Sequence, residues 1–170
     1  MPPRPLLFLD VDGPLNPYAA QPERRPEGYT TIRATIPSHP RPLRVWLNPT
    51  HGPSLLTLPY DLVWATTWMS LANTWIAPAL DLPPLPYVDF GPDLLALRPD
   101  ELHWKTPHLL TYAAGRPFAW VDDEHSPADT EYVTAHHPAP ALLHHVNPRL
   151  GLREGDFRVL EDWARDEATA

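Results

Sequence analysis

The chain has 170 residues and a formal net charge of −8, with 21 acidic residues against 13 Lys and Arg. This length suits one domain with a sizeable core, and the negative charge excludes a global basic field that would attract nucleic acid or anionic lipid. Cysteine is absent, which excludes disulfides, thiolate catalysis and thiolate zinc sites. Apolar runs are too short to span a membrane and the first strand begins too early for a secretion signal. We therefore expect a single cytoplasmic domain over residues 1–170.

Short apolar runs bounded by turn residues predict the strands of a buried parallel sheet. These runs occupy residues 6–10, 61–65, 87–90, 117–121 and 141–146. Two further β-prone runs, 29–37 and 43–47, lie on either side of a Pro-rich turn. They predict a small hairpin, which forms an insertion over residues 28–48.

Helical signals lie between the predicted strands, at residues 49–58, 71–80 and 157–164. Thr106 followed by proline predicts a capped helix start, and Gly115 predicts the end of that helix. Ser126 followed by proline predicts the next capped start, with Asp129 placed to complete the cap in its first turn. Strands that alternate with helices indicate an α/β fold. We expect a doubly wound, mostly parallel, five-stranded Rossmann-like sheet with a small β-hairpin flap and no large cap domain.

Polar residues follow three of the predicted strands. Asp10 and Asp12 come after the first, Thr66 after the second, and Asp122 with Asp123 after the run that begins at residue 117. The carboxyl ends of parallel strands meet at one edge of a sheet, where α/β proteins bind ligands. Two carboxylates at such a strand end suit a divalent metal, or a nucleophile and its acid/base partner. The alternative is that they only cap an acidic turn.

The only lysine of the chain, Lys105, directly precedes the predicted helix start at Thr106. Helix N-termini favour anions, and a lysine there adds positive charge. Together with the carboxylates and a hydroxyl, this describes a site for a metal-bridged phosphoryl group. The alternative is that Lys105 is a cation on a solvated loop.

This ordered set of motifs resembles the haloacid dehalogenase-like (HAD) superfamily of phosphohydrolases. The resemblance covers about residues 5–125. Its four motifs match residues 6–13, 62–66, Lys105 and residues 118–123. The strings DVDGPLNP, TTW and WVDDE also resemble a smaller branch, the HAD domains of multidomain RNA-repair proteins.

The resemblance implies a role for each matched residue. Asp10 would be the nucleophile that forms an aspartyl-phosphate, and Asp12 would protonate the leaving oxygen and then activate water. Thr66 and Lys105 would hold the phosphate oxygens, whereas Thr67 is interpreted as strand-end structure.

The same resemblance implies Mg²⁺, held by Asp10, the main-chain carbonyl of Asp12 and the pair Asp122 and Asp123. The sequence leaves open which member of that pair contacts the metal directly. The implied activity is a Mg²⁺-dependent phosphomonoester hydrolase. The alternatives are a HAD-like binding module without turnover, and phosphoryl transfer to an acceptor other than water.

The predicted hairpin is the only segment that could cover the site. HAD enzymes without large caps tend to act on large substrates. Five arginines of the hairpin region are either solvated or able to grip a polyanion: Arg24, Arg25, Arg33, Arg41 and Arg44. We therefore expect a phosphorylated substrate such as a nucleotide or a nucleic-acid end. The alternative is a small sugar phosphate, and the oligomeric state is left open.

The remaining polar and aromatic candidates have less support. The histidine pairs 136–137 and 144–145 are poor chelates, because adjacent side chains on a strand point to opposite faces. His103 and His108 flank the lysine and could line the site. Trp68 is interpreted as core packing rather than as a platform for a substrate base.

Overall fold

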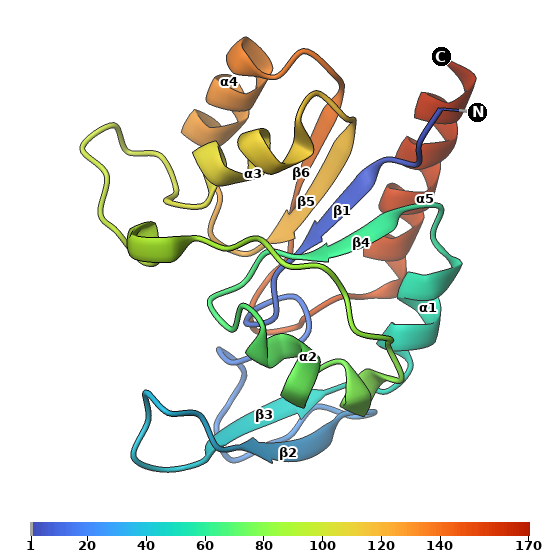
Figure 1. Cartoon of the computed structure of the whole chain (residues 1–170). Coiled ribbons are helices and arrows are strands. Elements are labelled where there is room, and N and C mark those ends of the chain that lie inside the picture. The colour runs from blue at the N-terminus through green and yellow to red at the C-terminus, as the bar shows by residue number, and fades with distance from the viewer. Residues whose placement is uncertain (1) are drawn as a thin grey trace.

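The computed structural model describes residues 2–170, in which strands and helices alternate along most of the chain (Figure 1). The strands are β1 (Leu6–Leu9), β2 (Thr30–Ala34), β3 (Leu43–Leu47), β4 (Asp61–Trp64), β5 (Phe118–Asp122) and β6 (Ala141–His145). The α-helices are α1 (His51–Thr57), α2 (Leu71–Trp75), α3 (Thr106–Ala113), α4 (Pro127–His136) and α5 (Glu154–Thr169). The two short 3-10 helices are η1 (Pro78–Leu80) and η2 (Gly91–Asp93).

The main sheet has four parallel strands in the order β4-β1-β5-β6. Strand β1 is central: Leu7 pairs with Leu62 of β4 on one side and with Ala119 of β5 on the other. The chain first adds β4 beside β1 and then crosses to add β5 on the opposite side. The carboxyl end of β1 is therefore a topological switch point, the usual ligand position in open α/β sheets.

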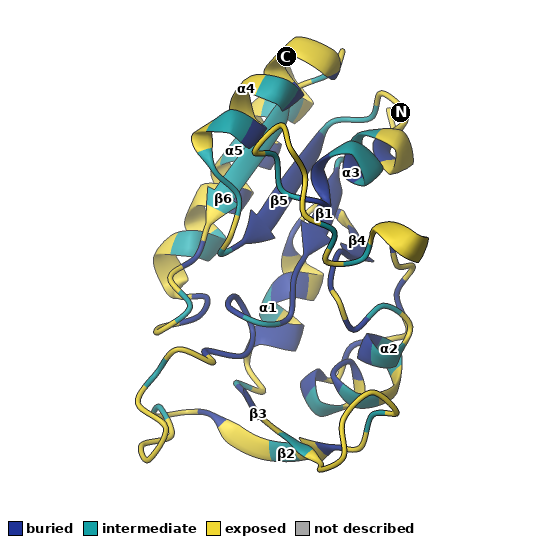
Figure 2. Cartoon of the chain, turned by 90° about the vertical axis from the view of Figure 1, so that its left-hand side faces the viewer, coloured by how far each residue is buried: buried dark blue, intermediate teal, exposed yellow. Residues whose placement is uncertain are grey.

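Helices cover both faces of this sheet, which confirms the doubly wound arrangement (Figure 1). Alternate side chains of β1 enter two separate cores, because successive residues of a strand point to opposite faces. Leu7 belongs to the cluster that includes Leu160 of α5, and Phe8 belongs to the cluster that includes Leu109 of α3. All four residues of β1 are consequently buried (Figure 2).

The expectation of a fifth strand was wrong, because residues 87–90 form only an isolated bridge to Trp64. The Val88 N–H donates to the Trp64 carbonyl, and no regular ladder follows. Three prolines among residues 83–86 explain this, since proline lacks an N–H and does not donate to a sheet ladder. The segment therefore runs along the edge of the sheet without extending it.

The predicted hairpin is confirmed as the antiparallel pair β2–β3, which forms a separate two-stranded sheet. It lies beyond the carboxyl ends of the main strands (Figure 1). Ala34, Val45 and Leu47 are buried in the same core cluster as α5 residues. The hairpin is thus a packed wall of the molecule rather than a loose flap.

Two predicted helix boundaries shifted. Pro78 divides the predicted helix over 71–80 into α2 and η1, because its ring cannot occupy a helix interior. The last residue of helix α3 is Ala113, and its C-cap is Ala114, a left-handed residue with φ of 47°, rather than the predicted Gly115. No helix in the described part of the chain combines the length and apolar character needed to cross a membrane.

Candidate active site

The predicted site residues gather at the carboxyl edge of the main sheet, beside a cavity of about 420 Å³. Asp10, Asp12, Asp123 and Lys105 line this cavity, together with Glu124. Residues of β3 of the hairpin and of the loop that follows η2 also line it. The expected carboxylates at the strand ends and the lysine at the start of α3 therefore lie in one place.

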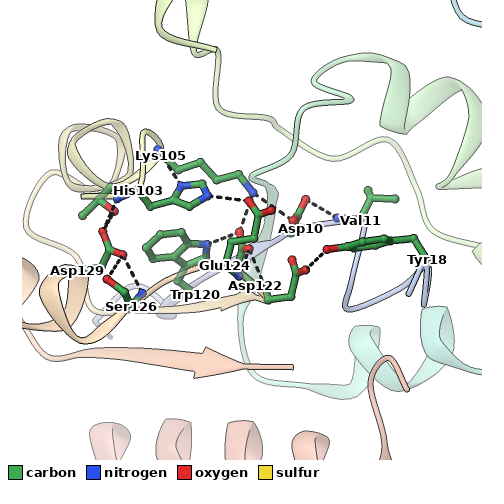
Figure 3. A network of polar contacts seen from close by, with 12 residues as sticks. Asp10, Val11, Tyr18, His103, Lys105, Trp120, Asp122, Glu124, Ser126 and Asp129 are labelled. Atoms are coloured by element: carbon green, nitrogen blue, oxygen red, sulfur yellow. Dashed lines mark hydrogen bonds and ion pairs between the residues drawn. The ribbon is translucent and has the colours of Figure 1, made fainter. Parts of the chain in front are cut away.

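Lys105 is buried, with 1% of its surface exposed, so the solvated-loop alternative is wrong. Its Nζ lies 2.6 Å from Oδ2 of Asp122 and 3.2 Å from Oδ2 of Asp10 (Figure 3). The N-cap position of α3 is Lys105 itself and not Thr106 as expected. The Thr106 hydroxyl donates instead to Asp129, at 2.6 Å.

Lys105, Asp10 and Asp122 form a buried triad, and burial and charge have opposite effects on their pKa values. Burial lowers the pKa of Lys105, but the ion pairs with Asp10 and Asp122 outweigh it and raise that pKa above its usual value. Burial would raise the pKa of Asp122, yet Lys105 holds it below its usual range. For Asp10 burial prevails, and its pKa lies well above the usual range. One ammonium therefore does not fully compensate the buried carboxylates.

Asp122 and Asp123 have different surroundings. Asp122 is fully buried, and its Oδ1 accepts the backbone N–H groups of Asp123 at 2.8 Å and Glu124 at 3.0 Å. Its Oδ2 accepts Lys105 Nζ and the indole N–H of Trp120, at 3.1 Å. Both carboxylate oxygens of Asp122 thus accept hydrogen bonds from neighbouring protein groups, and the side chain holds Lys105 in place.

Asp123, in contrast, lines the cavity and accepts a hydrogen bond from the Tyr18 hydroxyl at 2.7 Å. Burial raises the pKa of Asp123 to about 6. At Gly13 of the first motif, an added Cβ atom would lie 2.6 Å from the Asp123 carboxyl carbon. Gly13 also has φ of 105°, a backbone conformation that other residues rarely adopt. The glycine of the motif therefore makes room for Asp123.

Asp12 is oriented by two donors that the sequence analysis did not identify. Asn16 Nδ2 donates to Oδ1 at 2.9 Å, and the indole N–H of Trp68 donates to Oδ2 at 3.1 Å. Asn16 also accepts the backbone N–H of Trp46 in β3, at 3.1 Å, so it links Asp12 to the hairpin. Trp68 is largely buried as expected, but it contributes a hydrogen bond as well as packing.

The two threonines after β4 are placed differently from the expectation. Thr66 is 1% exposed and lies beside the cavity without lining it, while Thr67 is part of the cavity wall. The Thr66 hydroxyl oxygen accepts the backbone N–H of Trp68 at 3.2 Å. This leaves the Thr66 hydroxyl proton free to be donated.

Asp129 fixes the segment that carries Lys105 (Figure 3). Its fully buried carboxylate accepts the N–H of His103 at 2.8 Å, the Thr106 hydroxyl, and the N–H of Ser126 at 2.8 Å. The predicted helix start at Ser126 is confirmed, and the same acid that caps it ties α4 to the start of α3. Sequence reasoning placed Asp129 in the first turn of α4 but gave it no role at the site.

Of the two histidines that flank the lysine, only His103 lies next to the site. Its Nδ1 accepts the Lys105 N–H at 3.1 Å, so Nε2 carries the proton that faces Glu124 at 3.1 Å. His108 instead contacts Asp93, at 2.9 Å.

The histidine pair 136–137 lies at the end of α4 and not on a strand as expected, and His136 contacts the carbonyl of Tyr132. His137 contacts the carbonyl of Arg116, and His144 contacts Asp156. These contacts send the side chains to separate partners, so they do not converge on an ion.

Two groups of side chains in residues 2–170 have ligand atoms close enough to share a metal ion. Asp10, Asp122 and Asp123 form one, with ligand atoms within 4.8 Å of one another, and His103, Asp122 and Glu124 form the other. The first group offers only carboxylate oxygens and carries more negative charge than Lys105 offsets. Such a donor set suits a hard divalent cation.

Comparisons with protein-family models, with curated proteins and with solved structures give no match to this chain. The resemblance to the HAD superfamily therefore stays a prediction from motif order.

Proposed function

We propose that the protein is a Mg²⁺-dependent phosphomonoester hydrolase of the HAD type that works through an aspartyl-phosphate at Asp10. The observation that carries the proposal is the position of Lys105 Nζ, 3.2 Å from Asp10 and 2.6 Å from Asp122, at the switch point of the sheet. A buried cation beside a cavity-lining carboxylate favours the binding of an anion next to a nucleophile.

The residues present fit a Mg²⁺ ion, because the site is rich in carboxylate oxygen and has uncompensated negative charge. Asp10 and Asp123, with the main-chain carbonyl of Asp12, would hold it. Asp122 belongs to the same group, but its oxygens already accept protein donors, so we assign it to the positioning of Lys105. When bound, Mg²⁺ neutralises charge on the phosphoryl group.

The chain's own residues supply the chemical steps. A carboxylate oxygen of Asp10 forms a bond to phosphorus as the ester bond breaks, and Asp12 gives a proton to the departing oxygen. Asp12 then takes a proton from water, whose oxygen attacks phosphorus, and phosphate and the Asp10 carboxylate are released. Lys105, which lines the cavity, holds the phosphate oxygens during both steps.

The substrate we propose is a nucleotide or the phosphorylated end of a nucleic acid, with a small sugar phosphate as the alternative. A cavity of about 420 Å³ lies within the range of roughly 300–1,000 Å³ that is common for small-molecule sites. A cavity of this size accommodates a phosphate and part of its leaving group.

A phosphatase screen tests the proposal. The purified chain with Mg²⁺ is assayed for release of inorganic phosphate from nucleotides, sugar phosphates and phosphate-ended oligonucleotides, with Asp10→Asn as the matched control. We expect turnover that a chelator abolishes and that Asp10→Asn lacks. Equal turnover by Asp10→Asn would exclude the covalent mechanism, and no turnover on any substrate would favour the non-catalytic binding module.

A further inference from the structure

The hairpin segment concentrates positive charge in an otherwise acidic chain. Residues 28–60 contain no Asp or Glu, but they include Arg33, Arg41 and Arg44. In the described part of the chain, none of these three forms an ion pair, whereas Arg158 of α5 pairs with Glu154. Their charge is therefore available to an anionic ligand.

Two of these arginines lie directly opposite each other, since Arg33 of β2 pairs in register with Arg44 of β3. The N–H of Trp46 donates to Asn16 rather than to β2, so the pair that includes Trp46 lacks ladder hydrogen bonds. Hydrogen-bonded and non-hydrogen-bonded pairs alternate along an antiparallel ladder, so Arg33 and Arg44, two positions away, also form a non-hydrogen-bonded pair. The Cα atoms of such a pair lie about 4.5 Å apart. Like charges at this separation destabilise a hairpin, and a bound anion would remove that cost.

Arg44 is held at the cavity wall in a defined position. Its guanidinium carbon lies 3.8 Å from the ring centre of Trp46, and one of its N–H groups donates to the carbonyl of Pro22 at 2.7 Å. The guanidinium has five N–H donors, so most of them stay free. Of the five hairpin arginines considered from the sequence, Arg44 alone lines the cavity that contains Asp10 and Lys105.

Asn16 supports both Trp46, on which Arg44 is stacked, and Asp12, the proposed acid/base residue. Asn16 accepts the Trp46 N–H and donates to Asp12, so one side chain joins the platform of Arg44 to the carboxylate of the first motif. Two cations, Lys105 at the start of α3 and Arg44 of β3, thus line one cavity. This arrangement suits a substrate with two negative groups.

We infer that Arg44, assisted by Arg33, binds a second anionic group on the leaving group of the substrate while Lys105 binds the phosphoryl group that is transferred. This inference rests on the proposed function and narrows its substrate class. The favoured substrates are phosphate monoesters that also carry a phosphodiester, a second phosphate or a carboxylate. A sugar monophosphate with no further charge is a poor substrate.

The test compares pairs of substrates that differ in the second anion. Thymidine 5′-monophosphate is paired with the 5′-phosphorylated dithymidylate, fructose 6-phosphate with fructose 1,6-bisphosphate, and phenyl phosphate with 4-carboxyphenyl phosphate. Values of kcat/KM are measured for the wild type, Arg44→Gln, Arg33→Gln and Arg41→Gln. Arg41 is the matched control, because it is an exposed arginine of the same hairpin that does not line the cavity.

We expect the wild type to prefer the doubly anionic member of at least one pair by about tenfold or more, the worth of one hydrogen bond to a charged group. Arg44→Gln should remove most of that preference, Arg33→Gln should reduce it, and Arg41→Gln should keep it. The pair with the largest Arg44-dependent ratio identifies the source of the second anion. Equal kcat/KM within every pair, or equal effects of Arg44→Gln and Arg41→Gln, would overturn the inference.

A binding measurement separates this inference from the proposed hydrolysis. If the wild type releases no phosphate from any substrate, the proposed function fails, and calorimetric binding of the 5′-phosphorylated dithymidylate is compared among the same variants. A loss of affinity of about tenfold in Arg44→Gln but not in Arg41→Gln would then support the second anion site. Equal affinities, or no binding by the wild type, would refute it.

Discussion

Replacing Lys105 with methionine removes the cation between the site carboxylates and keeps most of the unbranched stem. The lysine Nζ lies 2.6 Å from Asp122 and 3.2 Å from Asp10, and the side chain is almost fully buried. After the substitution Asp122 keeps the Trp120 indole and two backbone N–H groups. Asp10 keeps only the N–H of Val11. Two buried carboxylates thus lose their counter-charge.

Removing one partner of a buried ion pair costs about 3–5 kcal/mol. In a chain of this length, 1 kcal/mol corresponds to about 2–4 °C in Tm, so Lys105→Met should melt roughly 6–20 °C below the wild type. The free energy of unfolding is measured by urea titration near neutral pH in the presence of a chelator. The deficit should shrink as the pH falls, because the uncompensated carboxylates of the folded variant take up protons.

Two further variants keep this prediction open to refutation. Lys105→Met/Asp122→Asn should recover part of the lost stability, because it also removes one uncompensated carboxylate. Arg158→Met is the control, since its ion pair with Glu154 is exposed and worth at most about 1 kcal/mol. If Lys105→Met were as stable as Arg158→Met, the buried triad would be refuted.

Three more predictions concern other parts of the structure. Gly13→Ala should destabilise the protein by about 1–3 kcal/mol and weaken Mg²⁺ binding, because it strains the backbone and displaces Asp123. Asp123→Asn should raise the Mg²⁺ concentration needed for half-maximal activity at least about tenfold. Burial lowers the pKa of His51 from 6.5 to about 4, so below pH 6.5 the unfolded chain takes up a proton at His51 more readily than the folded chain. The free energy of unfolding should therefore fall as the pH drops from 6.5 toward 4. The His51 share of that loss is about 3 kcal/mol, and His51→Gln should remove it.

Each of the predictions for Gly13, Asp123 and His51 has its own control or contradicting result. Gly155 in α5 has open space where a Cβ would lie, so Gly155→Ala should be neutral or stabilising, and equal effects at both glycines would refute the steric argument. An unchanged Mg²⁺ requirement in Asp123→Asn would remove that residue from the metal site. Equal pH slopes of stability in His51→Gln and the wild type would show that His51 does not titrate as described.

The strands of the main sheet were predictable where burial alone defines them. The residues of β1 are apolar because helices cover both faces, and this leaves a continuous pattern in the sequence. Residues 87–90 look similar, but the three prolines among residues 83–86 lack the amide hydrogens that a sheet ladder needs, and the segment forms only an isolated bridge. Composition alone did not distinguish a strand from an extended edge segment.

The site was predictable to the extent that it lies at strand ends. Asp10, Asp12 and Asp123 meet at the cavity because parallel strands share a carboxyl edge, and the start of α3 adds Lys105 there. The division of roles between Asp122 and Asp123 was not predictable, since it depends on where β5 ends and which side chain then faces inward.

The supporting residues were missed for a different reason. Asn16 contacts Trp46 and Tyr18 contacts Asp123, which are partners far away in sequence, and no local pattern marks such contacts. Asp129 was assigned to a helix cap, which it does form. Its hydrogen bonds to the Lys105 segment depend on how α3 and α4 pack together.

Trapping of the phosphorylated residue tests the central claim most directly. The chain is incubated with Mg²⁺ and acetyl phosphate, quenched with acid, reduced with borohydride and analysed by peptide mass spectrometry. An aspartyl-phosphate is reduced to homoserine, so we predict homoserine at position 10 in the wild type and none in Asp10→Asn. Phosphate release by the wild type with no modification at Asp10, or modification of another carboxylate, would contradict the account.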